Sequence, residues 1–197
     1  MTADGEHQPA LDKPNGEPAP DRAIAMACSG GDAKAVAELF ERYQIPVTRY
    51  LSRLTRDGDV EDLVQATFLQ IARGKAKFDG RSSVRTWLFA IATNVMQQHF
   101  RNNARHRRLL LALSNVQVGS ASTNLVEQID ARRSISYVRA AFESLSEKSR
   151  RAFLLCEVEG LSAREASEVL NASETAIWKR VSEVRKVLLS AAEDPQA

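Results

Sequence analysis

The sequence predicts an all-α protein made of two small helical domains joined by a flexible linker, with a helix-turn-helix in the second domain. From Arg22 onward, apolar residues recur with the period of a helix, and no segment shows the alternation of a strand. A small, polar segment without that period, residues 114–123, separates the two helical stretches and is expected to be the linker. The second stretch ends in two short helices around a tight turn, an arrangement that usually binds DNA.

Composition sets the domain boundaries. Residues 1–21 contain four of the six prolines and five acidic residues against Lys13 alone, which is typical of a disordered tail. The domains are then expected at 22–113 and 124–192. Because the tail is acidic and a later segment is basic, we also consider the hypothesis that the tail shields that segment.

The first domain should contain three main helices. Apolar residues from Leu39 to Leu54 predict one long helix, which Pro46 should bend or divide. A second helix, 59–73, has Asp59 at its N-cap and Gly74 near its end. Its exposed residues should include Glu61, Asp62, Gln65 and Leu69, and its buried residues Val60, Val64, Phe68 and Ile71.

The third helix follows a loop that begins at Phe78. We interpret Trp87 as a core residue, while Phe78 and Phe89 are equally compatible with the core and with base stacking. The apolar stripe of this helix comprises Val84, Trp87, Leu88, Ile91, Ala92 and Val95. Its other face should present Thr86, Ala90, Asn94, Gln97 and Arg101.

The second domain should begin with a helix near 124–144 and continue with one opened by Ser146. Capping signals then delimit the helix-turn-helix: a glycine stop, a capping box and a second serine N-cap. These signals are carried by Gly160, Ser162, Glu165 and Ser173. On the last helix the apolar face comprises Ile177, Val181, Val184 and Leu188, and the opposite face Thr175, Trp178, Lys179, Ser182 and Arg185.

Composition and motifs argue against several classes of function. The N-terminus lacks a signal pattern, and no apolar run reaches the roughly 18 residues of a membrane span, so we expect a cytoplasmic protein without membrane insertion. Cys28 and Cys156 lie far apart and are expected to be buried thiols rather than a redox pair. The sequence has no phosphate-binding glycine loop and no metal-ligand spacing around its histidines, so we expect no enzyme, metal or cofactor.

Charge is distributed unevenly along the chain. Residues 73–108 contain nine Lys or Arg residues against one acid, Asp79, and they include several aromatic residues. A basic segment can be a solvated helix face, but cations interleaved with aromatic rings are typical of segments that hold single-stranded DNA.

Two segments resemble the sigma factors of bacterial RNA polymerase. Residues 59–70 read DVEDLVQATFLQ, similar to the D-x-E-D-L-V-Q-x-x-F-L signature of the region that docks on the polymerase. Residues 78–94 read FDGRSSVRTWLFAIATN, similar to the stretch that follows it in the family. Together with the helix-turn-helix, the similarity covers roughly residues 22–190. The short linker resembles the extracytoplasmic-function (ECF) subgroup, which lacks the middle domain of housekeeping sigma factors.

The resemblance implies three binding surfaces. Core RNA polymerase would be bound by Asp59, Glu61, Asp62, Gln65 and Leu69. The acidic residues at the N-terminus of this helix can also serve only to stabilise the helix through its dipole. Promoter DNA at the minus-ten element would be bound by Phe78, Arg81, Ser82, Ser83, Arg85, Asn94, Gln97 and Arg101. The minus-thirty-five element would be bound by Arg164, Ser173, Thr175, Trp178, Lys179, Arg180, Ser182 and Arg185.

The chain departs from the family pattern in the second domain. Trp178 and Glu183 stand where family members commonly have basic residues, and Cys156 where they often have Arg. We therefore expect an unusual minus-thirty-five element, weaker binding there, or dependence on an activator. Arg164, Lys179, Arg180 and Arg185 can be phosphate contacts or solvated charges.

The resemblance also implies regulation by an anti-sigma factor. Two other classes of protein are alternatives to a sigma factor. A stand-alone helix-turn-helix regulator leaves the 59–70 helix and the aromatic, basic segment unexplained, and a nucleic-acid enzyme lacks a catalytic constellation.

Overall fold

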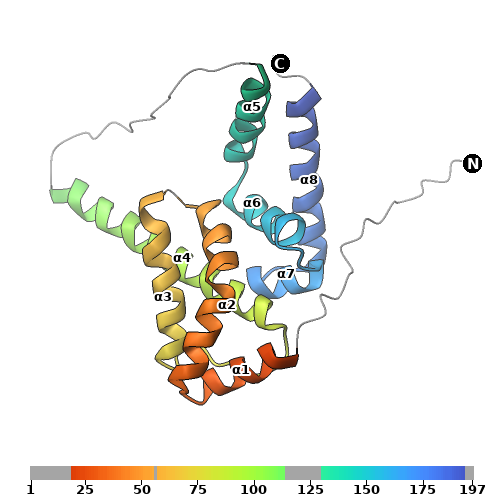
Figure 1. The fold of residues 1–197 in the computed structure, drawn as a ribbon. Helices are drawn as coiled ribbons and strands as arrows, with labels where there is room; N and C mark the ends of the chain where they lie inside the picture. Colours follow the sequence, from red (N-terminus) through yellow and green to blue (C-terminus); the bar gives the residue numbers. More distant parts are fainter. Residues whose placement is uncertain (1–18, 56, 114–129, 194–197) are drawn as a thin grey trace, which may run out of the picture.

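The structure, a computed structural model, describes residues 19–55, 57–113 and 130–193 (Figure 1). The described residues form helices and the turns between them, and no strand occurs among them. The all-α prediction is confirmed. The predicted linker, 114–123, lies outside the described residues, as does most of the predicted tail.

An N-terminal unit contains four α-helices: α1 (Ala19–Ser29), α2 (Ala33–Ser52), α3 (Val60–Ala72) and α4 (Val84–Leu113). A short 3-10 turn, Asp57–Asp59, precedes α3. Helix α2 packs against α1 and α3, and α3 packs against α4 (Figure 1). The predicted apolar faces of α3 and α4 form the centre of this unit, and Trp87 is half-buried against it.

Helix α1 begins earlier than the predicted tail boundary allows. Asp21, expected in the tail, is a buried residue of α1. Its carboxylate accepts a hydrogen bond of 2.5 Å from the Tyr43 hydroxyl and one of 2.6 Å from Arg42. The prediction that the acidic tail extends to residue 21 is therefore wrong, because a buried carboxylate needs partners and Asp21 finds them on α2.

Helix α2 runs without a break through Pro46, so of the two outcomes expected there, a bend or a new helix, the new helix does not occur. Proline removes one backbone donor, but burial of Tyr43, Val47 and Tyr50 on the same helix holds both halves against the core. Asp32 caps the start of α2 and accepts hydrogen bonds from the amides of Lys34 and Ala35.

Helices α3 and α4 agree with the predicted ranges, with two corrections. Asp59 occupies the N-cap position of α3 but makes no side-chain capping bond; its Oδ1 lies 3.3 Å from His99 Nε2 instead. Thr86, expected on the exposed face of α4, is 2 % exposed. Phe89 is also buried, so it belongs to the core and not to an exposed stacking surface.

A C-terminal unit contains α5 (Asp130–Ser144), α6 (Glu147–Phe153), α7 (Ala163–Leu170) and α8 (Glu174–Glu193). A π-helical turn, Leu154–Val158, extends α6 and was not predicted. The predicted caps are confirmed. The hydroxyl of Ser146 accepts a bond from Ser149 N, Ser162 and Glu165 form the complete capping box, Ser173 Oγ accepts a bond from Ala176 N, and Gly160 has φ +70°.

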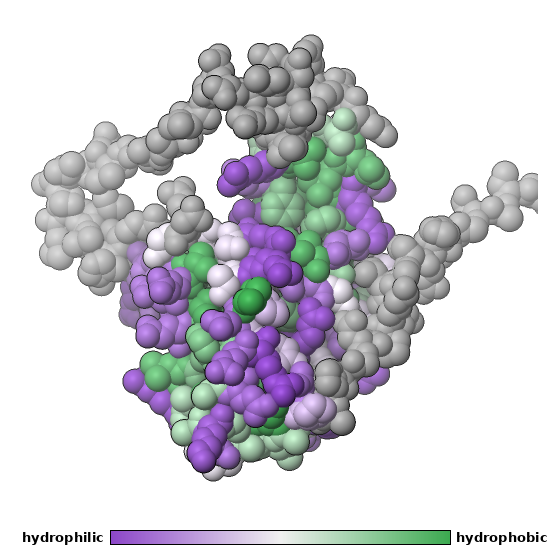
Figure 2. Space-filling view, in the orientation of Figure 1, coloured by the Kyte–Doolittle hydropathy of each residue, from purple (hydrophilic) through white to green (hydrophobic). Residues whose placement is uncertain are grey.

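The two units pack against one another. Helix α7 lies on α4 near its N-terminal end (Figure 1), and the buried residues of both units form one continuous hydrophobic cluster. Figure 2 shows hydrophilic residues over much of the N-terminal unit and hydrophobic residues gathered over α5 and α8. Large exposed apolar residues there include Tyr137 and Leu189.

Among the described residues, no helix combines the length and apolar character needed to cross a membrane. The same residues contain no group of three or more His, Cys, Asp or Glu side chains placed to hold a metal ion.

Candidate functional site

The exposed face of α3 carries the residues that the resemblance assigns to polymerase binding. Glu61, Asp62 and Gln65 are exposed, and Leu69 is 42 % exposed, which is unusual for a leucine on a packed helix. Val60, Val64 and Phe68 point the other way and are buried, so the helix offers a fixed surface. Asp59 is half-buried beside His99 at one end of this surface. Carboxylates beside an exposed leucine suit a basic, partly apolar partner helix.

Phe78 does not lie on an exposed DNA surface. The ring is 3 % exposed, packs against Trp87 with centroids 5.3 Å apart, and has the Arg22 guanidinium 5.8 Å from its centroid. Its backbone amide donates a 2.6 Å hydrogen bond to Ser29 Oγ. In this arrangement Phe78 anchors the loop to the core and offers almost no surface to DNA, and its contact with DNA stays a prediction.

Helix α1 holds the rest of that loop as well. Arg22 donates a hydrogen bond to the carbonyl oxygen of Gly80, whose φ of +75° favours glycine. Asp79 accepts a bond from the Arg81 amide and pairs with its guanidinium at 3.3 Å. The loop backbone is therefore anchored to α1, and the loop exposes Arg81, whose side chain is 89 % exposed.

The remaining residues assigned to minus-ten DNA divide into open and covered groups. Asn94 and Arg101 are exposed on α4, and Ser82 is half-buried in the loop. Gln97 is half-buried and lines a small cavity against the C-terminal unit. Ser83 and Arg85 are bound by carboxyl-bearing residues of that unit.

Glu159 is the partner of Arg85. The Arg85 Nη2 donates to the carbonyl oxygen of Glu159 at 2.8 Å and lies 3.6 Å from its Oε2. Arg53 approaches the other carboxylate oxygen at 3.4 Å. The Glu159 side chain is 3 % exposed. Burial raises the pKa of this carboxyl, and the neighbouring arginines Arg85, Arg53 and Arg49 oppose that shift.

Glu165 binds the start of α4. One of its oxygens accepts bonds from the Ser162 amide and hydroxyl, both at 2.9 Å, which completes its own capping box. The other oxygen accepts from Thr86 Oγ1 at 3.1 Å and Ser83 Oγ at 3.3 Å. A carboxylate at a helix N-terminus is also favoured by the helix dipole. Two residues of the C-terminal unit therefore cover part of the surface assigned to minus-ten DNA.

Helix α8 presents a polar face narrower than predicted. Thr175, Lys179 and Ser182 are exposed on it, and Ser173 is exposed at its N-cap. Trp178 is half-buried and packs against the core, so only part of its indole is open to solvent, and its contact with DNA stays a prediction.

The arginines assigned to minus-thirty-five DNA have different environments. Arg185 is held by Glu157 at 2.5 Å, and Arg180 is half-buried beside the small cavity. Arg164 is exposed, with Glu168 at 3.8 Å. Among the cations of α8 that are assigned to minus-thirty-five DNA, Lys179 is thus the exposed one.

Both cysteines are buried, as predicted. Burial is the main cause that raises the pKa of Cys28 to about 11 and that of Cys156 to about 12. Few thiolates are thus available at neutral pH, which argues against nucleophilic chemistry.

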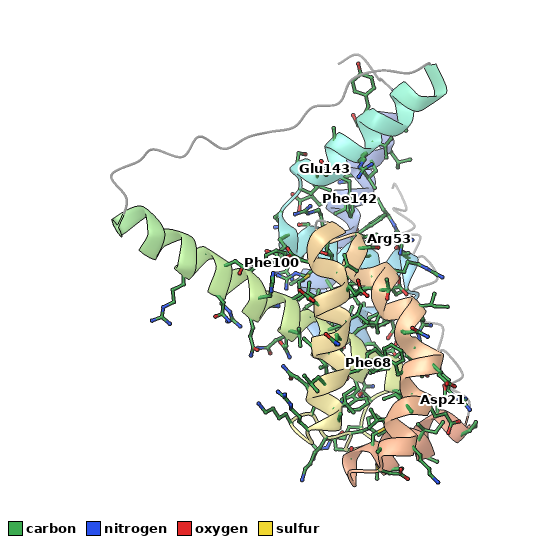
Figure 3. All side chains as sticks on the ribbon, turned by 60° about the vertical axis from the view of Figure 1, so that its left-hand side comes forward. Asp21, Arg53, Phe68, Phe100, Phe142 and Glu143 are labelled. Atoms are coloured by element: carbon green, nitrogen blue, oxygen red, sulfur yellow. The ribbon has the colours of Figure 1, made fainter. Side chains whose placement is uncertain are left out.

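A groove of about 1240 Å³ separates α2 and α4 from α5 and α6. Figure 3 shows Arg53, Phe100, Phe142 and Glu143 around it. Its apolar lining includes Leu54 and Leu154, and charged residues from both units surround that lining.

Sequence reasoning missed the residues that join elements distant in the chain. Arg22 and Ser29 support the loop, and Glu159 covers Arg85, yet none stands in a recognisable motif. Glu165 was predicted only as a capping residue. Its spacing to Ser162 indicates a helix start and gives no information on its contact with α4.

Two family profiles match the chain. Sigma-70 region 2 matches residues 39–106, and Sigma-70 region 4 matches residues 135–188. In the solved structure of CnrH in complex with the cytosolic domain of CnrY, a chain 25 % identical superposes with a TM-score of 0.63 over 90 % of this chain and 99 % of that one. The sigma factor RpoE from Bartonella quintana, solved with the anti-sigma factor NepR, shares the fold: its TM-score is 0.64 at 21 % identity, over 82 % of this chain and 98 % of that one.

Curated relatives extend over nearly the whole chain. The ECF RNA polymerase sigma factor SigC of Mycobacterium tuberculosis is 30 % identical over 174 residues, which cover 87 % of this chain and 90 % of the relative. The ECF RNA polymerase sigma-E factor of Haemophilus influenzae is 28 % identical over 175 residues, 85 % of this chain and 93 % of the relative. With both regions present in family order, this chain belongs to the ECF sigma factors of bacterial RNA polymerase.

Proposed function

We propose that this sigma factor binds core RNA polymerase through the exposed face of α3 and carries it to specific promoters. The observation that carries the proposal is the exposure of Glu61, Asp62, Gln65 and Leu69 on a helix whose other face is fully packed. Rigid presentation lowers the entropy cost of binding. In this proposal residues 22–113 act as region 2 and residues 124–192 as region 4.

Promoter opening would use the loop before α4 and the outer side of α4. Arg81, Asn94 and Arg101 are available for single-stranded DNA in the arrangement described here. Ser83 and Arg85 become available only when Glu165 and Glu159 move away. We therefore propose that the two units separate when the protein joins the polymerase, which uncovers the minus-ten surface.

Duplex DNA at the minus-thirty-five element would be read by α8. Thr175, Lys179 and Ser182 are the exposed polar residues that this helix can place in a major groove. Because Arg185 is paired with Glu157 and Trp178 is packed, the exposed face offers fewer cations than the family pattern suggests. Recognition at this element should therefore be weak or depend on an activator.

An anti-sigma factor is the regulatory partner that we propose. The groove between α2, α4, α5 and α6 has an apolar lining contributed by both units and a charged rim, which suits an amphipathic helix of such a partner. The relative CnrH was solved in complex with the cytosolic domain of CnrY. We propose that the protein acts in the cytoplasm, catalyses no reaction itself and needs no cofactor.

Co-elution with core RNA polymerase tests the proposal. The double variant Asp62→Ala/Gln65→Ala should no longer co-elute in size-exclusion chromatography, whereas Glu41→Ala/Glu168→Ala, which removes exposed carboxylates elsewhere, should behave as the wild type. Co-elution of the first variant would exclude α3 as the docking surface. A wild-type protein that binds duplex DNA but never the polymerase would favour a stand-alone regulator.

A further inference from the structure

A small cavity of about 170 Å³ lies where the helix-turn-helix meets α4. It is distinct from the large groove and has a different chemical character. From α4 it receives Gln97, and the C-terminal unit supplies the rest: Lys148, Arg151, Leu170, Asn171, Ala172 and Arg180. The described lining thus holds three cationic and two amide side chains, and no carboxylate.

Arg151 is the most deeply buried of the three cations. It is only 7 % exposed, and its Nη1 is buried with no hydrogen-bond partner in the described protein. Glu147 Oε1 lies 3.6 Å from the other terminal nitrogen, too far for a good hydrogen bond. A buried guanidinium nitrogen without a partner is costly, and such groups commonly mark a bound ion or water.

We infer that this cavity binds a phosphate group, either free inorganic phosphate or the phosphoryl group of a larger ligand. Two guanidinium groups and an ammonium group supply the positive charge, and the planar donors of arginine match the oxygens of a phosphate. The amides of Gln97 and Asn171 add neutral donors. A water molecule could satisfy one nitrogen, but it carries no negative charge to balance the three cations of the lining.

The position of the cavity gives the ligand a structural effect. Gln97 belongs to the N-terminal unit and the cations belong to the C-terminal unit, so a bound phosphate contacts both and stabilises their packed arrangement. This inference does not rest on the proposed function, because phosphate binding is measured on the isolated full-length protein.

The test is a titration of the full-length protein with inorganic phosphate at constant ionic strength, followed by calorimetry and by thermal unfolding. Phosphate should bind saturably and raise the Tm of the wild type, while chloride should not. Arg151→Gln should weaken phosphate binding by about tenfold or more. Lys148→Gln, at an exposed position, should weaken it less. The control Lys34→Gln removes an exposed lysine of α2 outside the cavity and should bind as the wild type does.

Equal affinity in the wild type and both cavity variants would overturn the inference, as would the absence of saturable binding. If Arg151→Gln fails to fold, the phosphate affinities of Lys148→Gln and Lys34→Gln are compared instead, and equal affinities overturn the inference. A competition arm with a short duplex of random sequence separates the two sources of the phosphate. Displacement of phosphate by duplex assigns the site to the DNA backbone, and undisturbed phosphate binding assigns it to a small anion.

Discussion

Arg85 at the start of α4 donates a 2.8 Å hydrogen bond to the carbonyl oxygen of Glu159, which lies 74 residues later in the chain. The contact joins a residue assigned to minus-ten DNA in region 2 to a buried acidic residue of region 4. Because Glu159 engages Nη2 of the guanidinium with its carbonyl oxygen and its carboxylate, the packed arrangement competes with a DNA phosphate for Arg85.

Glu159→Lys should open the two units. The substitution places a cation among Arg49, Arg53 and Arg85, where the wild-type carboxylate is attracted to all three. We expect a longer distance between fluorophores on α3 and α8, and binding of a minus-ten single strand that is stronger by about fivefold or more, since about 1 kcal/mol is a factor of five.

The matched control for that variant is Glu168→Lys. It makes the same change of net charge at an exposed position on α7, away from Arg85. If both variants bind the strand equally well, the gain comes from net charge, and the covering role of Glu159 is wrong.

Ser29→Ala should destabilise the loop before α4. The hydroxyl accepts the Phe78 amide at 2.6 Å, and the substitution leaves that amide without its partner. We expect a loss of about 1–2 kcal/mol, measured as a lower Tm and as faster amide exchange at Phe78. Ser167→Ala, which removes a hydroxyl bond to the Arg164 carbonyl within α7, should change exchange at Phe78 not at all.

Deletion of residues 1–18 should strengthen non-specific DNA binding at low salt if the acidic tail shields the basic segment. The deletion removes four acids and one lysine but keeps Asp21, whose bonds to Arg42 and Tyr43 support α1. The difference in DNA affinity between the deletion variant and the full chain should disappear at high salt, because screening weakens the attraction between exposed charges. Unchanged binding in a salt titration would refute shielding.

Stability should fall at alkaline pH. Burial raises the pKa of Cys28 from 9.0 to about 11, that of Cys156 from 9.0 to about 12 and that of Tyr50 from 10.0 to about 12. The folded state therefore keeps these protons when the unfolded state has lost them, so the contribution is fully present below pH 9 and is lost as pH rises toward 12. Denaturant unfolding at pH 7.5 and pH 10 measures this loss as a lower free energy of unfolding at the higher pH. In a Cys28→Ala/Cys156→Ala variant, the free energy of unfolding should decline less between these two pH values.

Local signals in the sequence predicted much of the fold. Helical periodicity located α3 and α4, and the spacing of Ser162 and Glu165 located the start of α7, because these features depend on neighbours three or four residues away. Of the bend or break expected at Pro46, the break did not occur, since burial of residues on both sides of the proline outweighs one missing backbone hydrogen bond.

Long-range contacts could not be predicted in this way. Phe78 reads equally well as a stacking residue or a core residue until Ser29 and Trp87 are placed around it. Thr86 seemed exposed on its own helix, but it is buried and its hydroxyl donates to Glu165 of the other unit. The packing of the two units depends on such pairs, which leave no periodic trace in the sequence.

Run-off transcription with core RNA polymerase shows whether the protein directs initiation at specific promoters. The templates are genomic fragments, including the DNA upstream of the protein's own gene. The wild-type protein should yield transcripts with defined start sites, Asp62→Ala/Gln65→Ala should abolish them, and Glu41→Ala/Glu168→Ala should retain them. Transcripts that persist undiminished with Asp62→Ala/Gln65→Ala, or duplex binding by the wild type without initiation on any fragment, would contradict the account.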